Sequence, residues 1–122
     1  MKLQPDKPDV QTVTAHGPGW VSINGERIDS SVVISSLGAR FAWSCERFEQ
    51  LDESHFARLA DLDAELVVFG SGTRLRFPRP AWISPLMKLR IGVETMDTAA
   101  ACRTYNILAA EGRRVVAALL IE

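Results

Sequence analysis

Short runs of apolar and β-branched residues dominate the first half of the chain, and this pattern predicts strands rather than helices. The runs cover residues 10–15, 20–23, 26–28, 32–34 and 41–43. Asn24-Gly25 separates the second run from the third. Because both residues tolerate a positive φ, the pair predicts a tight hairpin turn. We therefore expect an N-terminal antiparallel β-hairpin followed by two further short strands.

The second half of the chain alternates between helical and strand patterns. Helices are predicted from an N-cap at Asp52 to about residue 61, from an N-cap at Ser84 through Pro85 to a closing Gly92, and over residues 99–111 behind a cap at Asp97 or Thr98. The apolar runs 66–69 and 115–121 predict central strands covered on both faces, and a short strand is predicted at 93–95. The fold class is thus α/β: a single three-layer domain with a mixed, largely parallel central sheet, helices packed on it and an N-terminal β-hairpin. It spans residues 10–122 behind a flexible leader, residues 1–9.

Composition narrows the functional classes. The chain has 122 residues with 14 basic and 15 acidic side chains, a net charge of −1, so no nucleic-acid partner is expected. Two histidines and two cysteines are too few for a dense metal site, so we expect no bound metal. Cys45 and Cys102 form no CxxC pattern and are expected to be reduced, small hydrophobic residues, whereas His16 and His55 are expected to be surface imidazoles.

No apolar run approaches the roughly 20 residues that a membrane-spanning helix requires. The first nine residues contain two prolines and no apolar core, so they do not resemble a targeting signal. The chain is therefore expected to be cytoplasmic and not an integral membrane protein.

Two predicted loops carry polar groups that could form a site. Gly70, Ser71, Gly72 and Thr73 follow one predicted buried strand, and Met96, Asp97 and Thr98 link another strand to the longest helix, with Asn106 further along it. Because sites in open α/β sheets lie beyond the carboxyl ends of strands, the two loops are expected to meet. Two interpretations stay open: a binding site for a small anion or small molecule, or a tight turn and a helix cap without a ligand.

The stretch from residue 74 to residue 90 is locally basic and contains aromatic side chains. Arg76, Arg79 and Trp82 form the candidate partner patch, which could contact an acidic protein, a phosphate or single-stranded nucleic acid, or could be a solvated rim. The near-neutral net charge favours a protein or a small anion among these ligands.

Two segments resemble one known family. They are residues 92–120, with Met96-Asp97-Thr98, Cys102, Asn106 and Glu111-Gly112-Arg113, and residues 65–73, where Gly70-Ser71-Gly72 replaces the family's Gly-Thr-Gly. The chain resembles the Mth-type small α/β family that includes mitochondrial complex I assembly factor three and the adipogenesis-associated Mth-domain protein. It is expected to be a bacterial member. The resemblance implies a three-layer fold, no established catalytic activity or cofactor, and, for the mitochondrial members, binding to complex I subunits or assembly partners.

Two functional hypotheses follow. The first is a non-enzymatic protein-interaction domain that acts as an assembly or stability factor for a membrane-associated, respiratory-type complex and binds a protein partner not yet identified. The alternative is a small-anion, small-molecule or enzymatic site at the 70–73 and 96–98 loops. The sequence does not determine the oligomeric state.

Overall fold

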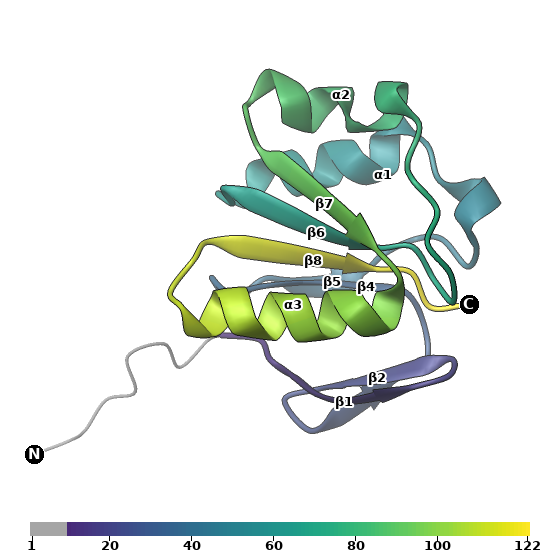
Figure 1. The fold of residues 1–122 in the computed structure, drawn as a ribbon, viewed down its shortest axis with the longest axis vertical. Coiled ribbons are helices and arrows are strands. Elements are labelled where there is room, and N and C mark those ends of the chain that lie inside the picture. The colour runs from purple at the N-terminus through teal and green to yellow at the C-terminus, as the bar shows by residue number, and fades with distance from the viewer. Residues whose placement is uncertain (1–9) are drawn as a thin grey trace, which may run out of the picture.

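The computed structural model describes residues 10–122, in which two sheets and three α-helices form one domain (Figure 1). The expected leader, residues 1–9, lies outside the described residues. The smaller sheet is antiparallel in the order β1-β2-β3, with β1 at Val13–Gly17, β2 at Trp20–Ile23 and β3 at Glu26–Ile28. The larger sheet has the order β5-β4-β8-β6-β7, with β4 at Val32–Ser35, β5 at Arg40–Ala42, β6 at Leu66–Gly70, β7 at Gly92–Met96 and β8 at Val115–Leu119.

The larger sheet is mixed, as the sequence predicts. Strand β6 runs parallel to its neighbours β7 and β8, whereas β4 runs antiparallel to β5 and β8. The parallel character is therefore confined to one half of the sheet, which is less than the largely parallel arrangement expected. The parallel half contains the strand ends that carry the candidate loops.

Helices cover both faces of the larger sheet and produce three layers. Helix α3 (Thr98–Ala110) packs on one face together with the smaller sheet, and helices α1 (Glu53–Ala57) and α2 (Pro80–Lys88) pack on the other. Strand β8 serves both cores, because Ala117 and Leu119 point to the α3 side while Ala118 and Leu120 point to the opposite side. This alternation explains why the 115–121 run has no polar residue.

Aromatic side chains fill the core beneath α1 and α2. The rings of Trp43, Phe56 and Phe69 meet edge to face, with centroids 5.4–5.9 Å apart. Such pairs stabilise a core by about 0.5–1.5 kcal/mol beyond the burial of their area. Trp82 on α2 packs on Phe56 and on Phe48, which lies in the 3-10 turn Phe48–Gln50. Trp82 is thereby tied to the core and is only half-buried.

Several predicted boundaries are observed. Asn24 and Gly25 adopt φ values of 50° and 86° in the turn between β2 and β3, as the hairpin prediction requires. Asp52 caps α1 by accepting a hydrogen bond from the Ser54 N–H at 2.9 Å, and a second 3-10 turn, Arg58–Asp61, follows the helix. Asp97 is the N-cap of α3. The first strand, however, begins at Val13 rather than at Val10.

The prediction for α2 is wrong at both ends. The helix begins at Pro80 with Arg79 as N-cap, so Pro85 lies inside it rather than at its start. Pro85 leaves the carbonyl of Ala81 without its usual backbone donor, which is tolerable because Ala81 is exposed and water can donate instead. The closing residue is Arg90, with φ of 59°, whereas Gly92 is the first residue of β7.

Candidate functional site

The two loops that follow β6 and β7 lie against each other, because neighbouring parallel strands end at the same edge of a sheet. The backbone N–H of Ser71 donates to the carbonyl of Met96 at 2.8 Å, and the N–H of Thr98 donates to the carbonyl of Gly72 at 2.9 Å. A side chain at Gly70 would bring its Cβ to 3.0 Å from the Cα of Thr98, so the close approach of α3 requires glycine there. The structure thus brings together the loops in which the sequence suggests a site.

Both hydroxyl groups at this junction form hydrogen bonds within the fold. The fully buried Ser71 hydroxyl donates to a carbonyl of its own loop at 2.7 Å and accepts from the N–H of Arg76 at 3.0 Å. The Thr98 hydroxyl donates to the carbonyl of Leu120 at 2.8 Å and accepts from the N–H of Gly72 at 2.9 Å. Because a hydroxyl has one hydrogen, neither group can donate to a ligand without breaking one of these bonds.

The remaining residues of the two loops have separate roles. The carboxylate of Asp97 accepts from the N–H of Ala100 at 2.9 Å and caps α3. Thr73 is exposed, and Met96 packs against the core on the α3 side of the sheet. Of these side chains, Thr73 and Asp97 remain accessible enough to meet a ligand.

Asn106 lies two turns along α3, away from the loops, and holds the edge of the smaller sheet. Its carbonyl oxygen accepts from the N–H of Val13 at 3.0 Å, and its amide nitrogen donates to the carbonyl of Val13 at 2.8 Å. The neighbouring Tyr105 hydroxyl donates to the carbonyl of Gln11. Burial raises the pKa of Tyr105, so its hydroxyl keeps its proton. These bonds give Asn106 a structural place in the fold.

A hollow of about 290 Å³ opens beside the joined loops. The loops contribute Gly72, Thr73, Asp97 and Thr98, whereas the other walls come from residues 16–21, at the turn between β1 and β2, and residues 120–122. These other walls were not predicted, because residues 16–19 lie between two expected strands and residues 120–122 lie at the end of an apolar run. No motif in the local sequence indicates that the smaller sheet packs beside the carboxyl ends of β6 and β7.

The acidic side chains Asp97 and Glu122 line this hollow, and none of its lining residues is lysine or arginine. A carboxylate repels an anion and attracts a cation. Glu122 is paired with Arg76, so Asp97 is the lining carboxylate without a basic partner among the described residues, and the lining offers no lysine or arginine that could hold the small anion of the alternative hypothesis.

Neither cysteine is placed as a nucleophile. Burial raises the pKa of Cys45 to about 11 and that of Cys102 to about 11, so both are thiols rather than thiolates at neutral pH. Cys102 borders a second, more open hollow of about 370 Å³, next to Asn106. Within residues 10–122, no group of three or more His, Cys, Asp or Glu side chains is arranged to hold a metal ion.

The two histidines differ in their surroundings. His16 lines the first hollow and is half-buried. His55 is not the solvated surface imidazole that we expected: its Nδ1 accepts from the N–H of Asp52 at 3.2 Å, and its Nε2 donates to the carbonyl of Ser44 at 2.9 Å. His55 therefore helps to start α1.

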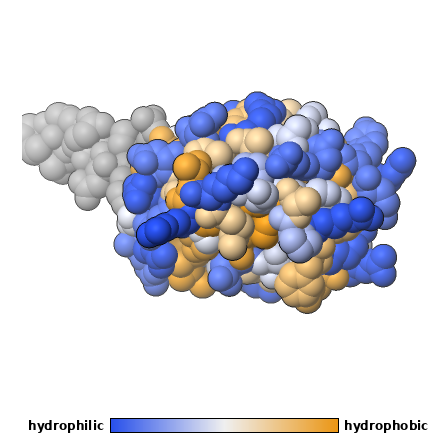
Figure 2. Space-filling model, turned by 90° about the horizontal axis from the view of Figure 1, so that it is seen from above, coloured by the Kyte–Doolittle hydropathy of each residue, from blue (hydrophilic) through white to orange (hydrophobic). Residues whose placement is uncertain are grey.

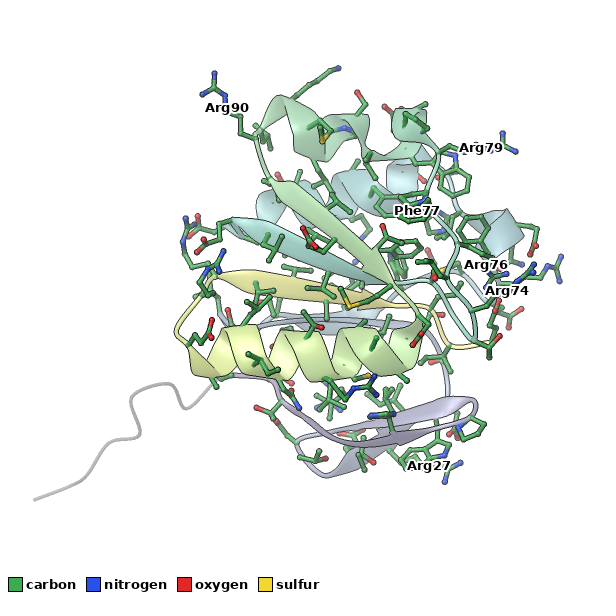
Figure 3. All side chains as sticks on the ribbon, in the orientation of Figure 1. Arg27, Arg74, Arg76, Phe77, Arg79 and Arg90 are labelled. Atoms are coloured by element: carbon green, nitrogen blue, oxygen red, sulfur yellow. The ribbon has the colours of Figure 1, made fainter. Side chains whose placement is uncertain are left out.

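The members of the candidate partner patch are not equally available. The guanidinium of Arg76 donates to the carbonyl of Ser71 at 2.7 Å, pairs with the carboxylate of Glu122 and covers the ring of Phe48 at 4.8 Å. Arg79 is exposed, with its guanidinium 5.8 Å from the ring of Trp82. Figure 3 shows Arg76 and Arg79 along the connection between β6 and α2. Arg79 can contact a partner directly, whereas Arg76 mainly fixes the connection.

Comparison with known proteins places this fold in a family. A family model described as "Protein of unknown function (DUF498/DUF598)" matches residues 13–120. Assembly factor 3 of the NADH dehydrogenase (ubiquinone) 1 alpha subcomplex from Bos taurus is 28% identical over 120 residues, which are 97% of this chain and 65% of the bovine protein. The chain thus spans about two-thirds of the length of that relative. No helix of the described residues has both the length and the apolar character needed to cross a membrane.

Solved structures agree with this assignment. A crystal structure of a Bordetella parapertussis protein is 39% identical, covers 97% of this chain and 100% of its own, and has a TM-score of 0.89. A solution structure of a Bordetella pertussis protein, described as a Mth938-like domain, is 34% identical, covers 99% of this chain and 92% of its own, and has a TM-score of 0.84. The resemblance to the Mth-type proteins and to the complex I assembly factor is confirmed, and the chain belongs to the DUF498/DUF598 family.

Proposed function

We propose that this protein is a non-enzymatic interaction domain that helps to assemble or stabilise a membrane-associated, respiratory-type complex. The observation that carries the proposal is that the polar side chains in the loops after β6 and β7 form hydrogen bonds within the fold. The hydroxyls of Ser71 and Thr98 bond within the fold, and the carboxylate of Asp97 caps a helix. Catalysis by these groups would first require breaking bonds that hold the loops together.

Similarity to an assembly factor also supports the proposed role in the assembly of a complex. The bovine relative is named for the assembly of NADH dehydrogenase, and this chain aligns with it over 97% of its own length. Fold similarity by itself does not transfer a function. The proposal therefore needs a test in which assembly of a respiratory complex is measured.

The test is deletion of the gene in its own host, followed by native gel electrophoresis of the membranes and measurement of NADH:quinone oxidoreductase activity. We expect less assembled complex and recovery with the wild-type gene. A doubly substituted control, Ser71→Ala with Cys102→Ala, removes the buried hydroxyl and the buried thiol that an enzymatic alternative at this junction would have to use. If this variant is folded, it should still restore assembly. An unchanged complex in the deletion strain would contradict the proposal.

A second candidate function, small-molecule binding, is favoured by the hollow beside the loops. Its volume of about 290 Å³ is near the lower limit of ligand pockets. Ala99 lines this hollow and is exposed, so Ala99→Leu should reduce its volume without removing a hydrogen bond, while Ala110→Leu at the far end of α3 is the control. A fragment screen by NMR should shift the amides of Gly19 and Thr73 in the wild type and in the control, but not in Ala99→Leu. The absence of such shifts would eliminate this candidate.

A further inference from the structure

Positive charge is concentrated in one continuous stretch of the chain. Residues 66–93 contain five of the 14 basic residues, Arg74, Arg76, Arg79, Lys88 and Arg90, and none of the 15 acidic residues. The rest of the chain has nine of the basic residues and all of the acidic ones. Although the net charge is near zero, the basic and acidic residues are therefore distributed unevenly along the chain.

Exposed apolar side chains gather in the same stretch. Of the six large hydrophobic residues that are strongly exposed among the described residues, four lie here: Leu75, Phe77, Met87 and Leu89. Phe77 is 69% exposed and Leu75 is 53% exposed. A phenylalanine this exposed has little role in the core, and aromatic residues are enriched in protein interfaces. Figure 2, which views the molecule from the side of α2, shows hydrophobic side chains interspersed with strongly hydrophilic ones.

Hydrogen bonds and an ion pair of Arg76 anchor the connection that carries Leu75 and Phe77. The N–H of Arg76 and its guanidinium both bond to Ser71, and the guanidinium also pairs with Glu122. Pro78 and Pro80 restrict the backbone that follows. The side chain of Arg76 is mostly buried against Ser71 and Glu122, whereas its neighbours Leu75 and Phe77 are exposed to solvent. Because the connection is anchored before binding, a partner protein would lose little affinity to the entropic cost of ordering it.

Two positive charges flank these apolar side chains and have no acidic partner among the described residues. They belong to Arg74 and Arg79, both of which are exposed, whereas the charge of Arg76 is balanced by Glu122. Figure 3 shows Arg74, Phe77 and Arg79 along the same connection. We define Arg74, Leu75, Phe77 and Arg79 as the docking edge.

We infer that the docking edge binds an acidic segment of a partner protein, with an apolar side chain of that segment seated against Leu75 and Phe77. The inference rests on the proposed function and names the chemistry of the partner. Carboxylates of the segment would pair with Arg74 and Arg79, which can hold a carboxylate through two hydrogen bonds each.

A protein segment fits the docking edge better than a lipid surface or a nucleic acid does. Lipid-binding clusters contain about four to eight basic side chains, and nucleic-acid binding grows with the number of phosphates neutralised. The docking edge offers two free arginines, and the remainder of the chain has an excess of acidic residues that repels an extended anionic surface. Aromatic and arginine side chains on a rigid frame are instead typical of protein hot spots.

The test begins with a phage-displayed library of random peptides panned on the immobilised full chain. We expect enriched peptides in which acidic residues flank an aromatic or aliphatic residue. Binding of one labelled peptide to the chain is then measured by fluorescence anisotropy. Arg74→Glu with Arg79→Glu should weaken it more than tenfold, as should Phe77→Ser, and raising the salt concentration should weaken wild-type binding.

Matched controls lie on the outward face of α3. Arg103 and Ile107 are exposed there, with Ile107 at 59%. Arg103→Glu and Ile107→Ser repeat the same chemical changes away from the docking edge and should change affinity by less than about twofold. If they weaken binding as strongly as the docking-edge variants, the docking site is wrong.

Other outcomes would overturn the inference in distinguishable ways. Enriched peptides without acidic residues, no enrichment at all, or stronger Phe77-dependent binding to phosphatidylserine vesicles or single-stranded DNA would each contradict an acidic protein segment. The proposed function fails separately, when deletion of the gene leaves the respiratory complex intact. If deletion impairs assembly and the docking-edge variants still restore it, the function stands and the surface is elsewhere.

Discussion

Single hydroxyl and glycine residues determine how the strand ends of this protein are joined. The Thr98 hydroxyl bridges the N–H of Gly72 and the carbonyl of Leu120, so one side chain connects the loop after β6, the start of α3 and the end of β8. The Ser71 hydroxyl closes its own loop in the same manner. The Gly-Ser-Gly and Asp-Thr sequences, which at first suggest a ligand-binding loop, therefore have a direct role in the architecture.

Gly72 occupies a position in the junction where both the backbone conformation and the surrounding atoms disfavour any side chain. Its φ is 100°, and an added Cβ would overlap the carboxylate of Glu122 and lie 2.6 Å from Arg76 Nη2. Gly19 has φ of 77° but open space around it, which makes it a matched control. In urea denaturation, Gly19→Ala should lower the free energy of unfolding by about 1 kcal/mol, and Gly72→Ala by about 3 kcal/mol. Equal losses would show that the ion pair moves aside freely.

At the scale of elements, the sequence predicts best those features that depend on neighbouring residues. Asn24-Gly25, Asp52 and Asp97 each start or turn an element through local bonds, and the structure places each where expected. The start of helix α2 was predicted wrongly because proline favours the first helical position, and both Pro80 and Pro85 fit that preference. In the observed helix Trp82 packs on Phe48 and Phe56, a contact between residues distant in the sequence that a local rule does not include.

In the candidate site, too, some features follow from the local sequence pattern and others depend on contacts between residues distant in the chain. The meeting of the two loops follows from the parallel strand order, which the alternation of strands and helices implies. The far wall of the hollow depends on how the smaller sheet lies against α3. Asn106 and Tyr105 determine that position through bonds to Val13 and Gln11, 93 and 94 residues away in the chain. No pattern in the sequence connects residues so far apart.

Asn106→Ala should loosen the smaller sheet from α3. It removes both partners of the Val13 backbone, and leaving two partly buried backbone groups unpaired should lower the free energy of unfolding by about 2 kcal/mol. Hydrogen exchange of the Val13 amide should accelerate roughly tenfold or more. Ile107→Ala, at the next and exposed position, is the control and should leave that exchange rate unchanged. Unchanged exchange in Asn106→Ala would mean that other contacts hold β1.

On the scale of the whole molecule, charge is divided between separate regions. The basic and apolar docking edge belongs to the connection between β6 and α2, whereas acidic side chains serve structural bonds elsewhere. Glu65 accepts from the N–H of Arg114 at 3.2 Å and from the guanidinium of Arg113 at 3.1 Å, and so ties the start of β6 to the start of β8. The backbone bond from Arg114, followed by the bond from Arg113, lowers the pKa of Glu65.

This lowered pKa determines the sign of the pH dependence of stability. A carboxyl group with a lower pKa in the folded chain binds protons less readily there than in the unfolded chain, so its stabilising effect is complete above the unfolded pKa and is lost as the pH falls through the folded one. Asp52 acts in the same direction, because the hydrogen bond that its carboxylate accepts from the Ser54 hydroxyl lowers its pKa. From these two groups we expect urea midpoints that are level between about pH 7 and pH 5 and decline below that range.

Glu65→Gln tests the assignment. The variant loses the charged acceptor, so it should be less stable than the wild type at pH 7, and the difference should shrink as the pH falls and Glu65 becomes protonated in the folded as well as the unfolded state. Glu111→Gln removes the same charge at the exposed end of α3 and is the control for the change in net charge. Urea midpoints at pH 7, 5, 4 and 3 measure the difference. A Glu65→Gln curve parallel to that of the wild type would show that the carboxylate at the start of β6 does not cause the acid sensitivity.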